Sequence, residues 1–361
     1  MSNKSTKVKT HLLSIDIGSH SVKVATGQRN GDRIKITALA KQELPKGVFT
    51  NGVLSDPLAL KTTIQAILKQ NNIKQKDTVL TYESQDIIKR EMIVPKVDPK
   101  DQFELITFEV GQYLPIDIEA YVLQYKVLEE FDEDNKPKLK ILLGAIPKDI
   151  VKALYELVED CGLNPLYMDM HSNSLEKFIE FGFDSLTMNK TIAMIDFGHQ
   201  LIDISLFEKG VFKFNRLLRL GAGEFDRILV HNLDIDPAEA ESRKKKTSIL
   251  AIQKAKLEDI TDESDVKSTV IKETLSYINE CADEIEKVFK YYTSRNTDNK
   301  IDQIYLFGGG AQFKEIAPFF NERFDINTEV ISNFNMIDIA TKNPVEEIPV
   351  YVHAAGALVR K

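Results

Sequence analysis

Two aspartates in this chain end similar apolar segments, and each is followed two positions later by a glycine. The segments are Ile15-Asp16-Ile17-Gly18 and Ile195-Asp196-Phe197-Gly198, which a shift of 180 residues superimposes. The residues after each glycine match as well, with Val22 aligned on Ile202. Internal similarity of this kind indicates two copies of one structural unit.

Each copy has residue types that suit a phosphate and metal site. An aspartate at the end of a buried strand directs a carboxylate into the crevice beyond the sheet. A glycine without Cβ lets backbone N–H groups approach an anion closely. Since carboxylate and phosphate repel, the pair requires a divalent cation between them, held through water as Mg²⁺ usually is. Two facing turns could therefore hold a nucleotide's phosphates and its metal.

The alternative is that each turn is an ordinary hairpin, where Asp and Gly are common. Either copy alone is equally consistent with that interpretation. The occurrence of two matching copies, each after an apolar run, favours a functional site.

The elements that must position these turns alternate between strands and helices, which favours an α/β class. Asn30-Gly31 between apolar runs predicts a hairpin, and Asp56-Pro57 predicts a helix start. From Ile271 onward, apolar residues recur at steps of four and three and predict one long helix. The expected strands are 11–18, 22–28, 33–39, 78–82, 89–94, 120–129, 139–146, 191–198 and 301–307. The expected helices are 57–70, 100–113, 148–161, 238–257 and the one from 271.

Composition limits the class of protein. A chain of 361 residues is too long for one ordinary core and fits two domains. Its net charge of −8 argues against a large nucleic-acid surface. No apolar run is long enough for a membrane span, and the polar N-terminus shows no signal peptide. Cys161 and Cys281 are isolated, as in proteins of a reducing cytoplasm. We therefore expect a cytoplasmic protein without direct membrane insertion.

Five segments resemble the actin/Hsp70/sugar-kinase superfamily and, within it, the bacterial pilus-assembly family PilM. The resemblance covers about residues 11–360. The segments are IDIGSHSVKV, FEVGQYLPIDIEAYVLQYKVLEE, IDFGHQLIDISLFEKGVFKFNRLLRLGAGEF, IYLFGGGAQF and HAAGALVR.

The resemblance implies an actin-like (ribonuclease H-like) two-domain α/β fold with an FtsA-type inserted 1C subdomain. The implied parts are a first nucleotide domain 1A (11–83, 169–189 and 350–361), the inserted subdomain 1C (84–168), a second nucleotide domain 2A (190–232 and 301–349) and a subdomain 2B (233–300).

The same resemblance implies an ATP site. Asp16 and Asp196 would hold Mg²⁺ through water, and Lys23 would contact phosphate. Residues of the two turns would line the phosphates, while a triple glycine would pass the adenine and ribose. AESRK matches a segment by which relatives touch ribose and base, although a charged helix face would look the same. The implied nucleotide contacts are Gly18, Ser19, His20, Lys23, Gly198, His199, Gly221, Gly223, Glu241, Lys244, Gly308, Gly309 and Gly310.

Three features depart from the family pattern. His20 and His199 stand where relatives usually carry small or hydroxyl residues, and Gly221-Ala222-Gly223 replaces adjacent glycines. These departures put turnover in doubt more than binding. No general base can be singled out in the sequence, so we expect at most slow ATP hydrolysis.

Other functions fit less well. Gly221-Ala222-Gly223 invites a dinucleotide fingerprint, but Asp226 stands where that motif needs a small residue. No P-loop motif occurs. A small-molecule kinase of the superfamily needs a positioned carboxylate base, and none stands out. An FtsA-like division protein usually extends into an amphipathic membrane helix, whereas this sequence stops at Arg360-Lys361.

The resemblance also implies partners. In the PilM family the N-terminal cytoplasmic tail of a PilN-like inner-membrane protein docks beside the inserted subdomain and recruits the protein to the membrane. Pilus motor ATPases are a further class of partner. Most aromatics of residues 84–168 fit an ordinary core, and the alternative is that some line the groove; they are Phe103, Phe108, Tyr113, Tyr121 and Tyr125. An acidic rim could come from Glu109, Asp117 and Glu119, which solvated faces explain equally well.

Overall fold

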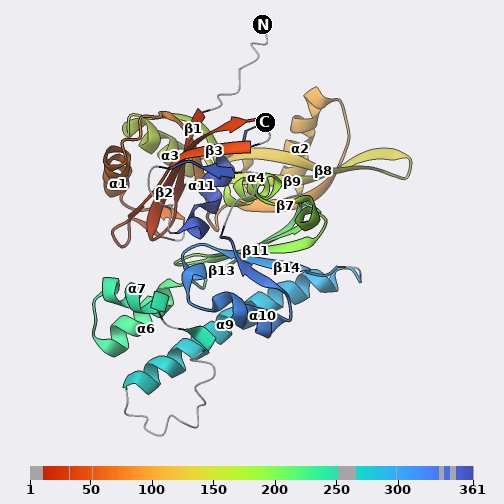
Figure 1. Cartoon of the computed structure of the whole chain (residues 1–361). Coiled ribbons are helices and arrows are strands. Elements are labelled where there is room, and N and C mark those ends of the chain that lie inside the picture. The colour runs from red at the N-terminus through yellow and green to blue at the C-terminus, as the bar shows by residue number, and fades with distance from the viewer. Residues whose placement is uncertain are drawn as a thin grey trace.

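The computed structural model describes residues 11–360, apart from 32, 51, 247, 251–265, 298, 333–336 and 342–346. Figure 1 shows two halves, one above the other, each built on a central sheet with helices against it. Within the described residues, no helix is both long and apolar enough to span a membrane.

The first half is built on a six-stranded sheet in the order β10-β6-β1-β2-β3-β16. β1, β2 and β3 are consecutive antiparallel strands, while β6 and β10 add on parallel to β1. Its strands are β1 (His11–Ile17), β2 (Ser21–Asn30), β3 (Arg33–Glu43), β6 (Asp77–Tyr82), β10 (Asn164–Met170) and β16 (Ile337–Ile339).

The second half repeats this arrangement in a five-stranded sheet, β13-β12-β11-β14-β15. β11, β12 and β13 are antiparallel, and β14 and β15 add on parallel to β11. Its strands are β11 (Thr191–Phe197), β12 (Ile202–Glu208), β13 (Val211–Leu218), β14 (Gln303–Phe307) and β15 (Thr328–Val330). The internal repeat predicted from the sequence is therefore present as two sheets that share the order of five strands, and β16 is an addition to the first sheet.

Helices cover both sheets, so the central strands β1 and β11 are buried almost throughout, as strands between two helical layers are. The Asp56 side chain caps α1 by accepting a bond from the Ala59 N–H, as the sequence predicts. The first half carries α1 (Pro57–Gln70), α3 (Lys148–Asp160), α4 (His171–Gly182) and α11 (Val352–Ala357), and the second carries α6 (Gly223–Leu233), α7 (Pro237–Lys246), α9 (Val266–Ser294) and α10 (Ile316–Phe324). The short elements are β4 (Phe49–Thr50), β5 (Val53–Leu54), α5 (Ser185–Met188) and the 3₁₀ turns Gly310–Gln312 and Ile348–Tyr351.

One hydrophobic cluster joins the two halves. It contains buried residues of the first sheet, the second sheet, α4 and α11, including Ile36, Phe178, Met194, Phe307 and Val352. Two further clusters each belong to one half. Because apolar burial is the main driving force of folding, this shared cluster fixes the two halves against each other.

A third, smaller sheet lies beside the first half with a hydrophobic core of its own. Its antiparallel strands run in the order β7-β9-β8, and Val94, Ile106, Leu123 and Ile141 are buried between sheet and helix. We call this unit the inserted subdomain. It consists of β7 (Ile88–Pro95), α2 (Pro99–Tyr113), the 3₁₀ turn Ile118–Ala120, β8 (Tyr121–Glu133) and β9 (Lys136–Pro147).

The structure draws narrower limits for this unit than the predicted range 84–168. The amphipathic helix α3 buries Leu154, Leu157 and Val158 in the core of the first half, and β10 pairs with β6. At the other end of the chain, β16 pairs with β3 of the first sheet, although 301–349 was expected to belong to the second half.

The single helix expected over 238–257 is wrong within the described residues. α7 ends at Lys246, and Ser248 instead forms an isolated bridge with Lys314. α7 is strongly polar, so little apolar burial drives its extension. Residues 251–257 lie outside the described part. The long helix predicted from Ile271 is confirmed as α9.

Candidate functional site

A cleft lies between the two sheets, at the turns that follow β1 and β11 and at the end of β14. Most residues predicted from the sequence line it, although they come from four distant segments. The lining residues among them are Asp16, Gly18, Ser19, His20, Lys23, Asp196, Gly198, His199, Glu241, Lys244, Gly308 and Gly309.

Three predicted glycines are placed behind the cleft wall. A Cβ on Gly221 or Gly223 would collide with His199, so these glycines let the start of α6 pack against the second turn. A Cβ on Gly310 would collide with Phe197. Ala222, between the first two, does line the cleft.

Both turns are closed in the same way, by a hydrogen bond from the glycine N–H. The Gly18 N–H donates to the Ser21 carbonyl at 3.1 Å, and the Gly198 N–H donates to the Leu201 carbonyl at 3.0 Å. In each hairpin the aspartate then faces the residue seven positions later, Lys23 opposite Asp16 and Asp203 opposite Asp196.

Asp16 is a buried carboxylate with three polar partners. It accepts bonds from the Thr81 hydroxyl and from His171 Nε2, both at 3.0 Å, and Lys23 Nζ lies 3.4 Å away. Burial alone would raise the pKa of Asp16, but Lys23 and His171 outweigh it and hold that pKa well below its usual range. Asp16 is therefore an anionic group at neutral pH.

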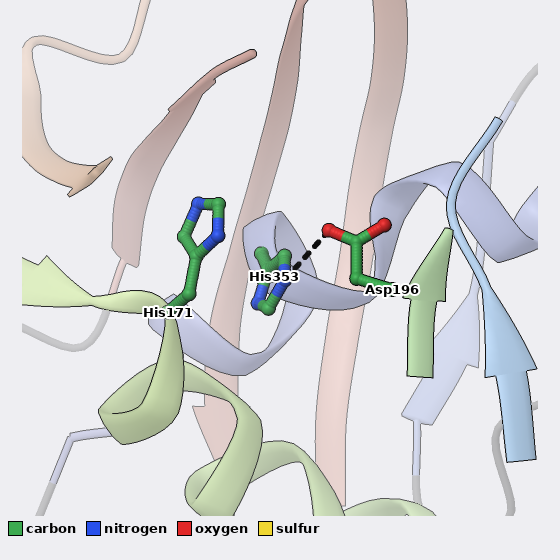
Figure 2. A group of neighbouring side chains, drawn as sticks. All are labelled: His171, Asp196 and His353. Carbon is green, nitrogen blue, oxygen red and sulfur yellow. Dashed lines mark hydrogen bonds and ion pairs between the residues drawn. The ribbon is translucent and has the colours of Figure 1, made fainter. Parts of the chain in front are cut away.

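Asp196 faces a second histidine. His353 Nε2 lies 3.3 Å from Asp196 Oδ2, and Figure 2 shows the His353 ring directed at this carboxylate. The rings of His171 and His353 stack with centroids 3.8 Å apart. Burial opposes charge on His171, yet the Asp16 contact outweighs it and raises the pKa of His171; burial and the adjacent His171 lower the pKa of His353.

Gly308 fits this site for a steric reason. It follows β14 with a positive φ of 84°, and a Cβ there would collide with the Asp196 carboxylate. Only glycine therefore lets the chain pass Asp196 in this conformation. Gly308, which was predicted to pass the adenine and ribose, therefore also packs against Asp196.

A polar network lies at the inner end of the cleft. Lys89 of the inserted subdomain donates to Glu83 at 2.5 Å and to the Asn215 side-chain oxygen at 3.1 Å. Asn215 in turn donates to Asp203. Glu83 and Asp203 both line the cleft. Burial raises the pKa of Asp203 to about 6, and Lys89 opposes that increase.

His20 and His199 come from different turns and stack across the mouth of the cleft, with ring centroids 4.7 Å apart. His20 Nε2 also lies 3.8 Å from Glu241. Burial, the nearby His20 and the Lys244 ammonium lower the pKa of His199 to about 4, so His199 is neutral at physiological pH. Lys244 pairs with Asp226 at 2.6 Å while lining the cleft.

Sequence reasoning missed His171, His353, Asp203, Glu83 and Thr81. The repeat contained the signal for Asp203, because it stands seven residues after Asp196 as Lys23 stands seven after Asp16. His353 lies within HAAGALVR, but nothing local distinguishes it from a residue of the closing helix. His171 follows β10, a strand that was not predicted.

The donor set suits a divalent cation and an anion. Two carboxylates on opposite walls supply oxygen ligands of the kind Mg²⁺ prefers. Lys23 and Lys244 add positive charge on the two walls. The cleft therefore has groups to hold a metal-bound polyphosphate.

The chain matches the family described as type IV pilus assembly protein PilM over residues 14–361. Among solved structures it is similar to the PilM-PilN type IV pilus biogenesis complex, at 18% identity and a TM-score of 0.78, with 96% of this chain and 97% of that chain covered.

Two further structures share the fold. The ethanolamine utilization protein EutJ from Carboxydothermus hydrogenoformans has 13% identity and a TM-score of 0.55, covering 98% of this chain and 90% of that chain. MreB5 of Spiroplasma citri bound to ADP has 11% identity and a TM-score of 0.52, covering 96% and 95%. These similarities confirm the actin-like α/β fold predicted from the sequence.

Proposed function

The chain belongs to the type IV pilus assembly protein PilM family, and we propose that it is an ATP-binding adaptor that docks the N-terminal tail of a PilN-like membrane protein. The observation that carries this proposal is a cleft with two opposed Asp-Gly turns next to a subdomain with its own core. The PilM-PilN complex among its structural relatives supports the choice of partner. The family match favours this function over a division protein or a small-molecule kinase.

The proposed ligand of the cleft is ATP with Mg²⁺. MreB5, which shares the fold, has structures with ADP and with AMPPNP. Asp16 and Asp196 would hold the cation from the two walls, and Lys23 would contact phosphate. The cation would neutralise part of the phosphate charge, which the acidic walls would otherwise repel.

Hydrolysis is proposed to be slow at most. The cleft does contain the carboxylates Glu83 and Asp203, but Lys89 and Asn215 hold them. His20 and His199 stack on each other and line the cleft beside the turns that carry them. Phosphate release from the purified protein measures this property, and fast, saturable release would favour a kinase-like enzyme instead.

The proposed docking surface is the α2 side of the inserted subdomain. Phe108 and Tyr113 are 63% and 65% exposed, and Phe103 stacks on Tyr125 at 6.4 Å. Tyr121 and Tyr125 pack partly against the subdomain core. The exposed aromatics offer anchors for apolar residues of an extended tail.

An acidic rim at this surface remains part of the proposal. Asp117 and Glu119 are exposed and Glu109 is half-buried. Asp117 also accepts the Glu119 N–H at 3.1 Å, so it has a structural role in the turn before β8. A basic residue in the tail would pair with this rim, and tail binding would place the protein at the inner face of the cytoplasmic membrane.

The test is a titration of the labelled N-terminal tail of the PilN-like protein against the full chain, with and without Mg²⁺-ATP. We expect Phe108→Ala with Tyr113→Ala to weaken tail binding by about ten-fold or more, the size of a typical anchor loss. Leu58→Ala is the control, because Leu58 on α1 is also a largely exposed apolar side chain, at 72%, but lies outside the inserted subdomain. Equal tail affinity in the double variant would place the groove elsewhere.

The nucleotide site is tested by measuring Mg²⁺-ATP binding to the Asp16→Ala variant by calorimetry. Loss of this charged contact should weaken Mg²⁺-ATP binding by about 10–100-fold. Thermal unfolding of the variant must be measured as well, to show that it is folded, because the substitution removes the acceptor of Thr81 and His171. Unchanged Mg²⁺-ATP affinity in the folded variant would contradict the site.

A further inference from the structure

The floor of the cleft is packing that the two halves share. Phe307 lines the cleft and belongs to the hydrophobic cluster that joins the halves. Its ring packs edge-on against the ring of His353, which also lines the cleft, with centroids 5.2 Å apart. Figure 2 shows the Asp196 carboxylate beside His353 at this floor. Because the halves are held together here, the cleft can widen by movement at its mouth.

The contact across the mouth is a pair of histidine rings, one from each half. His20 follows β1 in the first turn, and His199 follows β11 in the second. Their rings stack with centroids 4.7 Å apart and an angle of 27° between the ring planes. The two side chains are 37% and 32% exposed, against 3% for Asp16 and 5% for His353. The stack is therefore much closer to solvent than these two buried side chains.

The two rings are not held equally. A Cβ on Gly223 would lie 2.5–2.9 Å from atoms of the His199 ring, so this ring is packed directly on the start of α6. The His20 ring lies 3.8 Å from Glu241 and 4.0 Å from Glu43, both beyond hydrogen-bond distance. His20 can therefore leave the stack by rotating its side chain without breaking a hydrogen bond to either glutamate.

The stack borders the place where a ligand phosphate would lie. Each histidine stands within two residues of the glycine of its turn, Gly18 or Gly198. A phosphate held between the two turns would therefore lie beside the rings. A stack of two rings changes an equilibrium by about two- to twelve-fold, which is enough to favour the closed mouth and still permits opening.

We propose that the His20–His199 stack is a gate of the cleft, and that it must open each time a nucleotide enters or leaves. The proposal rests on the proposed function for the identity of the ligand, Mg²⁺-ATP. A gate slows entry and release alike, because the same closed mouth opposes both. Its removal should therefore speed up both steps.

The kinetic experiment mixes the full chain with Mg²⁺ and ATP that carries a fluorescent group on its ribose, in a stopped-flow instrument. His20→Ala should raise the association and dissociation rate constants together, each by about two- to twelve-fold. His20→Phe keeps a planar ring without its nitrogens and should keep both rate constants near those of the wild type. His231→Ala is the matched control, because His231 is exposed on α6 and does not line the cleft.

A direct contact between His20 and phosphate would give a different pattern. Loss of an attractive contact mainly speeds dissociation and leaves association unchanged. A phenylalanine could not replace such a contact. Faster dissociation alone, in both His20→Ala and His20→Phe, would overturn the gate and leave the nucleotide site standing.

The gate can also be measured without a nucleotide. Ser21 lines the cleft and is 4% exposed, so Ser21→Cys places a thiol there with little change in shape. Reaction of this thiol with a thiol reagent reports how often the cleft opens. His199→Ala removes the partner ring from the opposite wall and should speed up this reaction by about two- to twelve-fold.

Cys161 is the internal reference for the thiol experiment. It follows α3, is only partly buried and does not line the cleft, and mass spectrometry resolves its reaction from that of the introduced thiol. Its reaction rate should not change in His199→Ala. A parallel rise at Cys161 would show that the substitution loosens the whole fold, and this would count against the gate.

The two experiments separate the gate from the proposed function. Equal reaction of the introduced thiol with and without His199→Ala would overturn the gate, whether or not a nucleotide binds. Absence of nucleotide binding to the wild type would instead refute the nucleotide site. The thiol rates would then still decide whether the two rings close the cleft.

Discussion

At the scale of single residues, the two hairpins place opposite charges at the same position. Lys23 faces Asp16 and neutralises it at 3.4 Å, whereas Asp203 faces Asp196 and adds a second acid. The first turn therefore carries its own counter-charge. The second turn carries two carboxylates. A cation is therefore attracted most strongly to this wall of the cleft.

Asp203 should make folding stability depend on pH in a definite direction. Burial raises its pKa to about 6 in the folded chain, against about 3.9 for an unfolded Asp. The folded state therefore binds more protons between pH 4 and 6, and stability is lost as pH rises through this window. Asp203→Asn removes that loss, so the variant should gain on the order of 1–3 kcal/mol over wild type above pH 6.

Urea unfolding of both proteins from pH 4 to pH 8 measures the effect. Asn can still accept the bond from Asn215, which keeps the local contact. Asp338→Asn is the control, because Asp338 pairs with Arg33 at the surface and its pKa is lowered, not raised. The stability difference between Asp203→Asn and wild type could instead stay constant across this pH window. That result would show that folding does not raise the pKa of Asp203.

At the scale of residues, a local motif in the sequence was enough to point to residues that line the cleft. Asp16, Asp196 and Gly308 were found because a strand end, a turn and a glycine run are visible in neighbouring residues. His171 and His353 were not, since they are 182 residues apart and meet only because α4 and α11 pack in one cluster. A close pair of that kind is created by tertiary packing and has no local signature.

At the scale of elements, β7 links the inserted subdomain to the cleft. Lys89 projects from this strand and is nearly buried between Glu83 of the first half and Asn215 of the second. It is the counter-charge for the acids at the inner end of the cleft. A strand that belongs to the proposed docking unit thus contributes a charge to the proposed nucleotide site.

Lys89→Met should destabilise the fold strongly. Removing one partner of a buried ion pair typically costs about 3–5 kcal/mol, because the remaining charge loses its compensation. Lys96→Met is the matched control, because Lys96 directly follows β7 and pairs with Glu130 at the surface. Loss of an exposed ion pair costs about 0–1 kcal/mol of stability. Guanidinium unfolding of both variants gives the comparison. Equal losses would mean that the Lys89 pair is solvated.

At the scale of elements, the sequence predicted which helices and strands are present better than it predicted which domain each belongs to. The helix predicted over 148–161 is present as α3, but its buried stripe of Leu154, Leu157 and Val158 does not say which sheet it covers. The inserted range was therefore drawn too wide. β10 was missed because Pro165 and Asp169 interrupt its apolar pattern, although pairing with β6 makes it a strand.

At the scale of the whole molecule, cores decide which parts unfold together. The cluster containing Phe178, Met194 and Phe307 spans both sheets, whereas Val94, Ile106 and Ile141 form a core within the inserted subdomain. Units that bury their own apolar surface can open separately. The two sheets should therefore unfold as one unit, and the inserted subdomain should have an opening of lower free energy.

Two core substitutions of comparable burial test this division. Ile106→Ala in α2 should lower the opening free energy of β7, β8 and β9 amides by about 2–5 kcal/mol and leave β1 and β11 unchanged. Phe178→Ala in α4 should lower protection in β1 and β11 alike by about 3–5 kcal/mol, because its cluster joins both sheets. Native-state hydrogen exchange resolves these strands separately. If Ile106→Ala reduced protection of β11 as much as that of β9, the inserted subdomain would be part of one cooperative core, and a partner docked there would bear on the stability of the whole chain.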